Sequence, residues 1–417
     1  MTRPIGNKIP KILFLSSHAP QGEDHGARLR VRHLLHQFSK FAEVRLVLAG
    51  AYERYSGVIS TVSNPTRPSE VFEFQPWKIG RWRDRFRLEF GSDYLNTNRS
   101  KASVEDRARL MHLIGMHDLV WVHGMVVANS FDLWRWPKSI LDIDDIPSSR
   151  TWSEMIQEIS PLAKIQAFRK HYLWKRQESR IFERFDAMTV CSQSDRSYFG
   201  NSERAFVIPN GFDAPSEFAT RMPSRPARIG FIGSLEYPAN AKGMRWFLSK
   251  VWPRILKKDS TVKLRLVGRN SMNPEWLASP NVEGLGWVGD ADSEMATWSF
   301  TIVPVFEGGG TRVKISNAFS RKCPVVSTAL GAYGYEVASG RELLIADSID
   351  DFTSSCLRML HDKSFADQIT DNAWMAFLEN WTWDAIGKRV EQAVDFVLKG
   401  EGKGANKLEK RTSHEVL

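Results

Sequence analysis

The stretch "FTIVPVFEGGGTRVKISNAF", residues 300–319, joins an apolar run, three successive glycines and an amphipathic run. The apolar run at 300–305 has the length and composition of a buried strand, and the run over 313–321 has helical spacing. A further apolar run, "CPVVSTA" at 323–329, follows as the next strand. A strand, a glycine turn, a helix and a strand in this order are typical of a parallel α/β sheet.

The same alternation extends over the second half of the chain. Its other apolar runs are "RIGFIGS" at 228–234, "KLRLVGR" at 263–269, "NVEGLGWV" at 281–288 and "ELLIAD" at 342–347. We therefore expect a doubly wound, Rossmann-like domain over 228–380. Helical patterns at 350–361, 364–379 and 381–398 are expected to close the fold, and the polar remainder 399–417 to be disordered.

The first half has the same pattern, which predicts a first Rossmann-like domain over 1–210. Its apolar runs are 11–17, 44–50, 118–124, 139–145 and 187–193, with one long helix expected at 161–185. The Pro-rich stretch 211–227 is expected to be the linker. The predicted fold class is α/β, with two tandem doubly wound domains facing a cleft. The helix at 381–398 is expected to cross back to the first domain.

Composition agrees with this organisation. With 417 residues, of which 42% are hydrophobic and 25% charged, the chain is long enough for two cores. No apolar run approaches the roughly 18 residues that span a bilayer, so we expect a cytoplasmic protein. The three cysteines are widely spaced, which favours neither a disulfide framework nor a zinc site. The net charge of +9 lies mostly in the first half, and it is compatible with phosphorylated ligands, anionic lipid or nucleic acid.

The three glycines at 308–310 stand where a strand leads into a helix. Glycine lets backbone N–H groups approach an anion closely, and the helix adds its positive end. Arg312 and Lys314 can then neutralise a diphosphate, so the pattern predicts a pyrophosphate site. The alternative is a flexible turn beside two solvated cations, because lone glycine patterns are weak signals.

The sequence segments around this stretch resemble those of a known protein family. "PVFEGGGTRVKISNAFSRKCPVVSTALGAYGYEV", with "VIPNGFD", "IGFIGSLEYPANAKGMRWFL", "LVGR" and "GRELLIADS" around it, resembles the family 4 retaining glycosyltransferases of the GT-B fold, in their triple-glycine version. The first half matches more loosely, through "SSHAPQGEDHGARLRVRHLL", "DLVWVHG", "ILDIDDIPSSR" and "RFDAMTVCSQSD". The resemblance implies transfer of a sugar from a nucleotide diphosphate sugar to an acceptor hydroxyl with retention, in polysaccharide or glycoconjugate synthesis.

The resemblance also implies roles for residues of the second half. Gly308, Gly309, Gly310 and Thr311 would contact the donor phosphates, and Arg312 and Lys314 would stabilise charge on the departing diphosphate. Lys242 matches one member of a basic pair in the family, whereas Leu235 stands where the other cation is common. Asn317 stands where relatives have a glutamate that binds the nucleotide ribose, and an amide makes weaker, neutral hydrogen bonds there.

In the first half, His123 ends an apolar run at a position where the family has a histidine that touches the donor sugar. Gly22, Gly26 and Arg28 lie in the first strand-to-helix loop, where the resemblance implies an acceptor or phosphate loop. For each of these residues the alternative is an ordinary packed or loop residue. The series Asp142, Asp144 and Asp145 is typical of metal-binding carboxylates in another fold, but the resemblance gives that role to Arg312 and Lys314. We therefore interpret the three aspartates as loop-turn and capping residues, with acceptor contacts and a metal site as the alternatives, and expect neither metal nor cofactor.

The stretch "PWKIGRWRDRFRLEF" at 76–90 interleaves cations with aromatic residues. Such a stretch predicts peripheral contact with the cytoplasmic membrane face, near a saccharide or lipid-linked acceptor, and the basic stretch 168–180 could extend it. Nucleic acid is a weaker expectation from the same composition. The alternative is a helix with a solvated basic face.

Two other functions remain open from the sequence. One is a catalytically silent subunit that binds a sugar nucleotide for a partner transferase, which Asn317 and Leu235 keep open. The other is a sugar-nucleotide epimerase, which needs carboxylates for proton abstraction, and the expected loops offer no pair outside 142–145.

Overall fold

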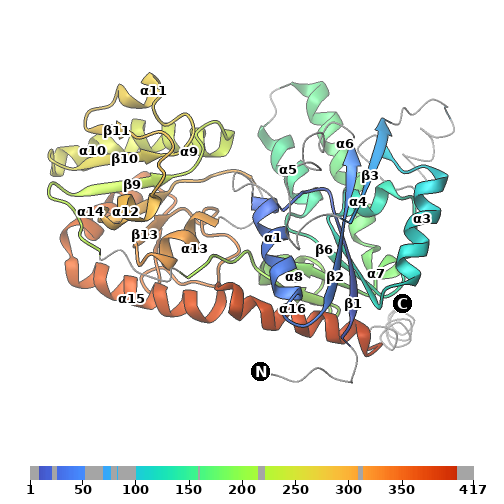
Figure 1. Ribbon diagram of the computed structural model, residues 1–417. Coiled ribbons are helices and arrows are strands. Elements are labelled where there is room, and N and C mark those ends of the chain that lie inside the picture. Colours follow the sequence, from blue (N-terminus) through green and yellow to red (C-terminus); the bar gives the residue numbers. More distant parts are fainter. Residues whose placement is uncertain are drawn as a thin grey trace, which may run out of the picture. The chain divides into compact units, whose positions relative to one another are not determined.

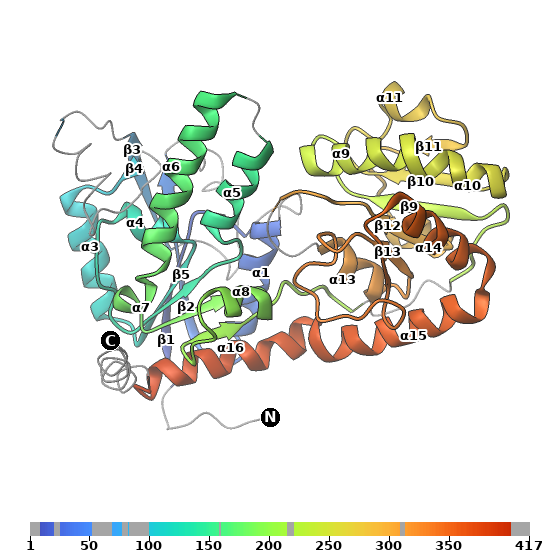
Figure 2. The ribbon, with the colours of Figure 1, turned by 180° about the vertical axis from the view of Figure 1, so that it is seen from behind.

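The computed structural model describes residues 9–20, 26–51, 69–76, 82, 100–157, 160–214, 221–308 and 313–401, and the structural statements below concern these residues. The chain divides into two compact units. Unit 1 comprises Met1–Pro209 and Ile386–Leu417, and unit 2 is Asn210–Ala385. In each unit, helices flank a sheet on both faces (Figures 1 and 2).

Unit 1 has an eight-stranded sheet in the order β4-β3-β2-β1-β5-β6-β7-β8, parallel except for β4. The strands are β1 Lys11–Ser16, β2 Glu43–Ala51, β3 Glu70–Pro76, β4 Ser100–Lys101, β5 Leu119–His123, β6 Ser139–Asp142, β7 Ala187–Val190 and β8 Ala205–Val207. The helices are α1 Gly26–Phe38, α3 Val104–Gly115, α4 Met125–Ser130, α5 Pro147–Gln157, α6 Pro161–Glu178, α7 Ile181–Arg184 and α8 Gln193–Tyr198. The strand order reverses between β1 and β5, which is where sheets of this type bind ligands.

Unit 2 has a six-stranded parallel sheet in the order β11-β10-β9-β12-β13-β14. The strands are β9 Arg228–Ile232, β10 Lys263–Val267, β11 Val282–Gly284, β12 Phe300–Val303, β13 Val325–Ser327 and β14 Leu344–Ile345. The helices are α9 Pro238–Trp246, a π-helical turn Phe247–Val251, α10 Trp252–Lys258, α11 Pro274–Leu277, α12 Ala291–Ala296, α13 Val313–Ser320, α14 Ile349–His361 and α15 Lys363–Asn380. The order is that of a Rossmann domain, with its reversal between β9 and β12.

Alternating side chains along the strands build a core on each face of both sheets. In unit 1, Leu13 and Leu15 of β1 pack with residues of α3 and α4, whereas the ring of Phe14 lies 5.9 Å from that of Phe38 in α1. In unit 2, Ile302 belongs to the cluster beneath α10 and α14, while its neighbour Val303 packs with α13 and α15. Successive side chains point to opposite faces of the sheet, and both faces are covered. Every residue of such a strand is therefore buried, so the strands appear in the sequence as continuous apolar runs.

The last helix, α16 Trp383–Leu398, begins in unit 2, and its residues from Ile386 onward belong to unit 1. Its buried side chains include Val390 and Val394, and the ring of Phe396 lies 5.3 Å from that of Phe206 in β8. In the stretch expected to be the linker, the backbone N–H of Phe212 donates to Trp381, and that of Met222 donates to Ala296.

One helix was predicted wrongly. The sequence suggests a single helix over 161–185, but α6 ends at Glu178 and α7 begins at Ile181. Between them Arg180 has φ −114° and ψ 16°, outside the helical region. The remaining C-terminal helices lie close to their expected ranges, and residues 402–417 of the expected tail lie outside the described part of the chain.

Candidate functional site

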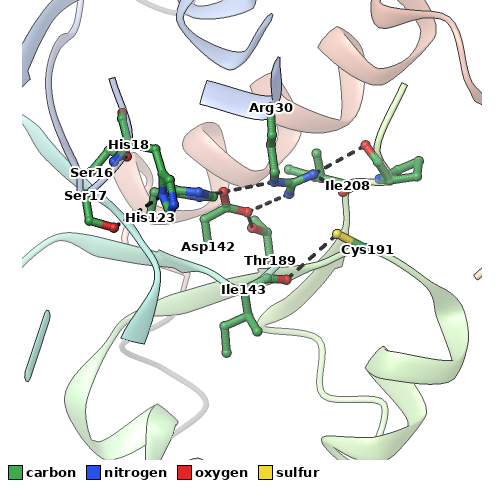
Figure 3. Close-up of polar contacts among 11 residues, drawn as sticks. Ser16, Ser17, His18, Arg30, His123, Asp142, Ile143, Thr189, Cys191 and Ile208 are labelled. Carbon is green, nitrogen blue, oxygen red and sulfur yellow. Dashed lines mark hydrogen bonds and ion pairs between the residues drawn. The ribbon is translucent and has the colours of Figure 1, made fainter. Parts of the chain in front are cut away.

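His123 is the last residue of β5 and lies beside the reversal of strand order in unit 1. Its register partners are Ser16 on β1 and Asp142 on β6, so three strand ends meet at one edge of the sheet. The imidazole is buried, and its Nδ1 lies 2.8 Å from Oδ2 of Asp142 (Figure 3). Gly124 follows with φ 91°, a conformation that favours glycine and turns the chain directly into α4.

Asp142 is fully buried and holds several donors at once. Arg30 of α1 donates to it from Nε at 3.1 Å and from Nη2 at 2.6 Å, and the hydroxyl of Thr189 donates at 2.5 Å. The remaining guanidinium nitrogen, Nη1, donates to the carbonyl of Ile208 at 3.0 Å. Figure 3 shows this network converging on one carboxylate from three elements of unit 1.

The charges of this network shift its titrations in opposite directions. Burial alone would raise the pKa of Asp142, but Arg30 and the bond from His123 outweigh it and hold that pKa far below its usual range. Burial alone would lower the pKa of Arg30, and the charge of Asp142 outweighs this and raises it. Asp142 is therefore an ionised acceptor, and the interpretation of this residue as a loop-turn or capping residue is wrong, because it ends a buried strand.

The same charges shift the pKa of His123. Burial would lower the pKa of its imidazole, but the hydrogen bond to Asp142 and the charges of Asp142 and Asp144 raise it, against the opposing charge of Arg30. Because Asp142 only accepts, Nδ1 of His123 must carry the donated proton. Its Nε2 is then the ring nitrogen left to act on a ligand, and a raised pKa favours a proton there too.

The loop after β1 contributes a second histidine to this edge. The rings of His18 and His123 meet edge to face, with their centroids 5.9 Å apart. Nδ1 of His18 lies 3.3 Å from the hydroxyl of Ser17, and the hydroxyl of Ser16 donates to the carbonyl of His18 at 3.1 Å (Figure 3). His18, Arg30 and Thr189 were not predicted, because nothing in the sequence gives the register that brings β1, β5, β6 and β7 together.

The expected loop with Gly22, Gly26 and Arg28 is described only in part. Gly22 lies outside the described residues, Gly26 begins α1, and Arg28 lies half-buried on its first turn. Arg30, two residues further along α1, is the arginine that reaches the buried network.

In unit 2, loops at the carboxyl ends of the strands carry glycines with positive φ. Among them are Gly233 after β9, Gly268 after β10 and Gly308 after β12, with φ of 149°, 125° and 95°. A Cβ on Gly268 would lie 2.4 Å from the carbonyl oxygen of Gly233, so these two loops pass each other at a distance that only glycine allows.

Two predicted cations lie at this edge of unit 2. Nζ of Lys314, on the first turn of α13, donates to the amide oxygen of Asn240 at 2.8 Å and lies 4.7 Å from the centre of the Phe231 ring. A Cβ on Gly233 would lie 3.3 Å from that Nζ, so backbone and ammonium are near neighbours. Lys242 of α9 pairs at 2.5 Å with Glu307, which directly precedes Gly308. The structure thus brings Lys242, Lys314 and Gly308 to one edge, with Asn240 and Glu307 as partners that were not predicted.

The other predicted residues of unit 2 have different surroundings. Asn317 lies on the next turn of α13, where its side-chain oxygen accepts from Arg321, and Arg321 also pairs with Asp292. Leu235 is buried in the core of unit 2. Gly309, Gly310, Thr311 and Arg312 lie outside the described residues.

Over the described ranges, no three His, Cys, Asp or Glu side chains gather as metal ligands. None of the described helices is long and apolar enough to cross a membrane. The basic stretch 76–90 lies outside the described residues except for Pro76 and Trp82, and the Trp82 side chain is exposed.

Comparisons with known proteins bear on both units. Residues 226–362 match a family model described as "Glycosyl transferases group 1". A protein of Klebsiella pneumoniae, described as uncharacterized and in the cps region, is 24% identical over an alignment of 221 residues that covers 48% of this chain. The match spans only 55% of that relative's length.

Solved structures match nearly the whole chain. Sucrose-phosphate synthase of Thermosynechococcus elongatus superposes with a TM-score of 0.65 at 14% identity, over 94% of this chain and 100% of the other. HepE of Anabaena, in complex with UDP-glucose, superposes with a TM-score of 0.57 at 15% identity, over 93% and 99%. The predicted fold class is confirmed: the chain has the GT-B architecture of two Rossmann-like domains. The family match supports the broader resemblance to glycosyltransferases, while the triple-glycine subgroup stays a prediction.

Proposed function

We propose that this GT-B chain is a group 1 glycosyltransferase that moves a sugar from a nucleotide diphosphate sugar to an acceptor hydroxyl with retention. The observation that carries the proposal is the edge of unit 2, where Lys242, Lys314 and glycines of positive φ meet inside the family-matched segment. Open backbone beside ammonium groups is the chemistry that binds a diphosphate.

The proposed roles of the unit 2 residues depend on how the negative charge of the diphosphate changes during the reaction. A nucleoside diphosphate leaves with more negative charge than it carries as part of the donor. Lys314 and Arg312 then stabilise the departing diphosphate, with Gly308, Gly309, Gly310 and Thr311 contacting its oxygens. Lys242 adds a third cation, and Asn317 supports the ribose with a neutral amide. These cations make a divalent metal unnecessary, so the proposed reaction is metal-independent.

In unit 1, His123 is proposed to contact the transferred sugar through Nε2. Its proton on Nδ1 is fixed by Asp142, so Nε2 can donate when the ring is charged. Asp142 itself is no base, because a carboxylate whose pKa is held far below its usual range binds a proton only weakly. This weakens the epimerase alternative, which would need a carboxylate to abstract a proton.

The class of donor and the biosynthetic process are proposed from the similar proteins. HepE was solved with UDP-glucose, which favours a nucleotide-sugar donor, and the Klebsiella relative lies in a cps region, which favours polysaccharide synthesis. The acceptor would be a saccharide or a lipid-linked saccharide, and the location is the cytoplasm, with peripheral contact to the membrane face. Nucleic acid is not expected as a partner.

The test is a panel of nucleotide diphosphate sugars with the purified full chain. Thermal shift reports donor binding, release of nucleoside diphosphate reports turnover, and each is measured with and without EDTA. We expect stabilisation by one donor with slow release that EDTA does not change, and NMR of the product with an added acceptor should show retained anomeric configuration. Stabilisation without release, even with acceptors, would favour the silent binding subunit, while stabilisation by none would remove the donor site from the proposal.

A further inference from the structure

α5 and α6 of unit 1 pack against each other (Figure 2). The side of α6 that contacts the rest of unit 1 is called its inner side. Leu173 and Trp174 of α6 are buried, and Glu178 accepts hydrogen bonds from the backbone N–H of Ser148 at 2.8 Å and from the hydroxyl of Tyr198 at 2.8 Å. The ring of Trp152 lies 5.0 Å from that of His171, which ties the two helices together. The orientation of α6 about its own axis is therefore set by its inner side.

The outer side of α6 is apolar where a surface helix is ordinarily polar. Leu162, Ile165, Phe168 and Tyr172 follow one another at spacings of three, three and four residues, so they form one row along the helix. Their side chains are exposed by between 54% and 74%. Trp152 and Ile156, one turn apart on α5, are exposed as well. We call the four residues of α6 the outer apolar row.

Cations accompany this row. Lys164, Arg169 and Lys175 are exposed on α6, at helical angles that place them within or beside the row. The single acidic residue of α6 is Glu178, which is buried on the inner side. The exposed side of α6 is therefore both apolar and positive, whereas a solvated surface helix mixes charges of both signs.

We propose that the outer apolar row, together with Lys164, Arg169 and Lys175, is a docking surface for an anionic lipid bilayer. Aliphatic and aromatic side chains enter the boundary between head groups and acyl chains, while lysine and arginine meet lipid phosphates at the same level. This surface is distinct from the stretch 76–90, and binding there does not depend on a nucleotide-sugar site in unit 2.

The composition of the surface favours lipid over two other occupants. Nucleic acid is bound through phosphates and stacked bases, and it gives no partner to exposed Leu162 and Ile165. A second copy of the chain would place the same surface against itself in a two-fold contact, so its cations would face like charges. A bilayer with anionic lipid accommodates both the apolar and the basic residues.

The test uses flotation of the full chain with vesicles of phosphatidylcholine alone or with one third phosphatidylglycerol. One variant, Ile165→Asn/Phe168→Asn, removes apolar contact, and a second, Lys164→Gln/Arg169→Gln/Lys175→Gln, removes charge. Matched controls are Val104→Asn/Met111→Asn on α3, which are also exposed apolar residues of unit 1, and Lys250→Gln/Lys257→Gln/Lys258→Gln in unit 2, which removes the same charge. Thermal unfolding and the donor-induced thermal shift are recorded for every variant.

We expect the wild type to float with anionic vesicles, and each outer-surface variant to bind them at least tenfold more weakly, with both controls close to wild type. Absence of flotation by the wild type, or full binding by the apolar variant, would overturn the proposal. Loss in the charge variant alone would mean phosphate contact without insertion, which also overturns it. A lipid-free dimer that only the outer-surface variants dissociate would assign the surface to a second copy instead. If the donor-induced thermal shift is unchanged in the variants, then a loss of vesicle binding concerns the docking surface alone and does not bear on the proposed transferase activity.

Discussion

His123 and Asp142 end neighbouring parallel strands, and the 2.8 Å contact between Nδ1 and Oδ2 makes one buried carboxylate the common partner of an imidazole and a guanidinium. A carboxylate shared in this way fixes the ring orientation and the proton on Nδ1 together. It also couples the protonation of His123 to the placement of α1, from which Arg30 reaches the pair.

Replacing Asp142 by asparagine should lower the free energy of unfolding by about 3 to 5 kcal/mol, because it leaves Arg30 buried without its counter-charge. The pKa of His123 should fall at the same time, as shown by NMR titration of labelled histidine. Asp186→Asn is the matched control, since Asp186 is a buried carboxylate directly before β7 whose arginine partner, Arg135, is half exposed. A His123 titration that is the same in Asp142→Asn and wild type would contradict the assigned contact.

Thr189→Val separates the hydrogen bond from the charge. The substitution removes the hydroxyl that donates to Asp142 at 2.5 Å and keeps Arg30 in place. We expect a loss of about 1.5 to 3 kcal/mol in urea unfolding, typical of a hydrogen bond to a charged group. A loss equal to that of Asp142→Asn would show that the hydroxyl, rather than the ion pair, carries the stability of the network.

The stability of the protein should depend on pH through His123 with a defined sign. Its pKa is raised on folding from an unfolded value near 6.5, so the contribution is fully present below that value and is lost as pH rises through the folded pKa. Asp142 acts at the other end: its pKa is lowered, so its contribution is present above the unfolded pKa, near 3.8, and is lost in acid. Urea unfolding between pH 5 and 9 should show the first loss in wild type and a flatter profile in His123→Gln; parallel profiles would refute it.

Lys314→Ala should lower turnover more than donor binding if the ammonium acts on the departing diphosphate. The expected cost in the chemical step is roughly 2 to 4 kcal/mol, with a much smaller change in the donor-induced thermal shift. Arg312→Ala, predicted from the sequence, should behave alike. Lys322→Ala, on a turn of unit 2 that follows α13, is the control. Equal losses of binding and turnover would assign Lys314 to ground-state binding only.

Gly243 in α9 tests how tightly the helix approaches β12. A Cβ there would lie 1.7 Å from the carbonyl oxygen of Pro304, so Gly243→Ala should cost at least about 1 to 3 kcal/mol of stability. Gly115, at the end of α3, has no heavy atom within 4 Å of such a Cβ, so Gly115→Ala should be neutral or stabilising by about 0.5 to 1 kcal/mol. Comparable Tm values for the two variants would contradict the packing.

The fold could be predicted because its strands are buried on both faces. Such strands appear as uninterrupted apolar runs that end in glycine or serine, as in 228–234 and 263–269, and those runs contain β9 and β10. The short antiparallel β4 has no such pattern, and β3 mixes polar residues with its buried Phe72 and Phe74, so neither strand was predicted. The break between α6 and α7 was also missed, because the sequence there has neither glycine nor proline.

The candidate site was predictable to the extent that it lies within short motifs. Lys314 and Gly308 belong to one continuous stretch, whereas Arg30, Asp142, Thr189 and the carbonyl of Ile208 come from four separate parts of unit 1. Only the register of parallel strands and the rotation of α1 bring those four together. The three aspartates of 142–145 looked alike in sequence, and the strand end at Asp142 is what separates a buried ion-pair partner from its half-buried neighbours.

The path of α16 bears on how the chain can fold while it is being synthesised. Unit 2 is one continuous segment, but unit 1 also contains the buried side chains of Ile386, Val390 and Val394 from a later part of the sequence. Domains generally fold as units during translation, in the order in which they emerge. The first part of unit 1 is synthesised before unit 2, but unit 1 is complete only after α16 has been synthesised. Part of its apolar surface therefore stays uncovered until the whole of unit 2 has emerged from the ribosome.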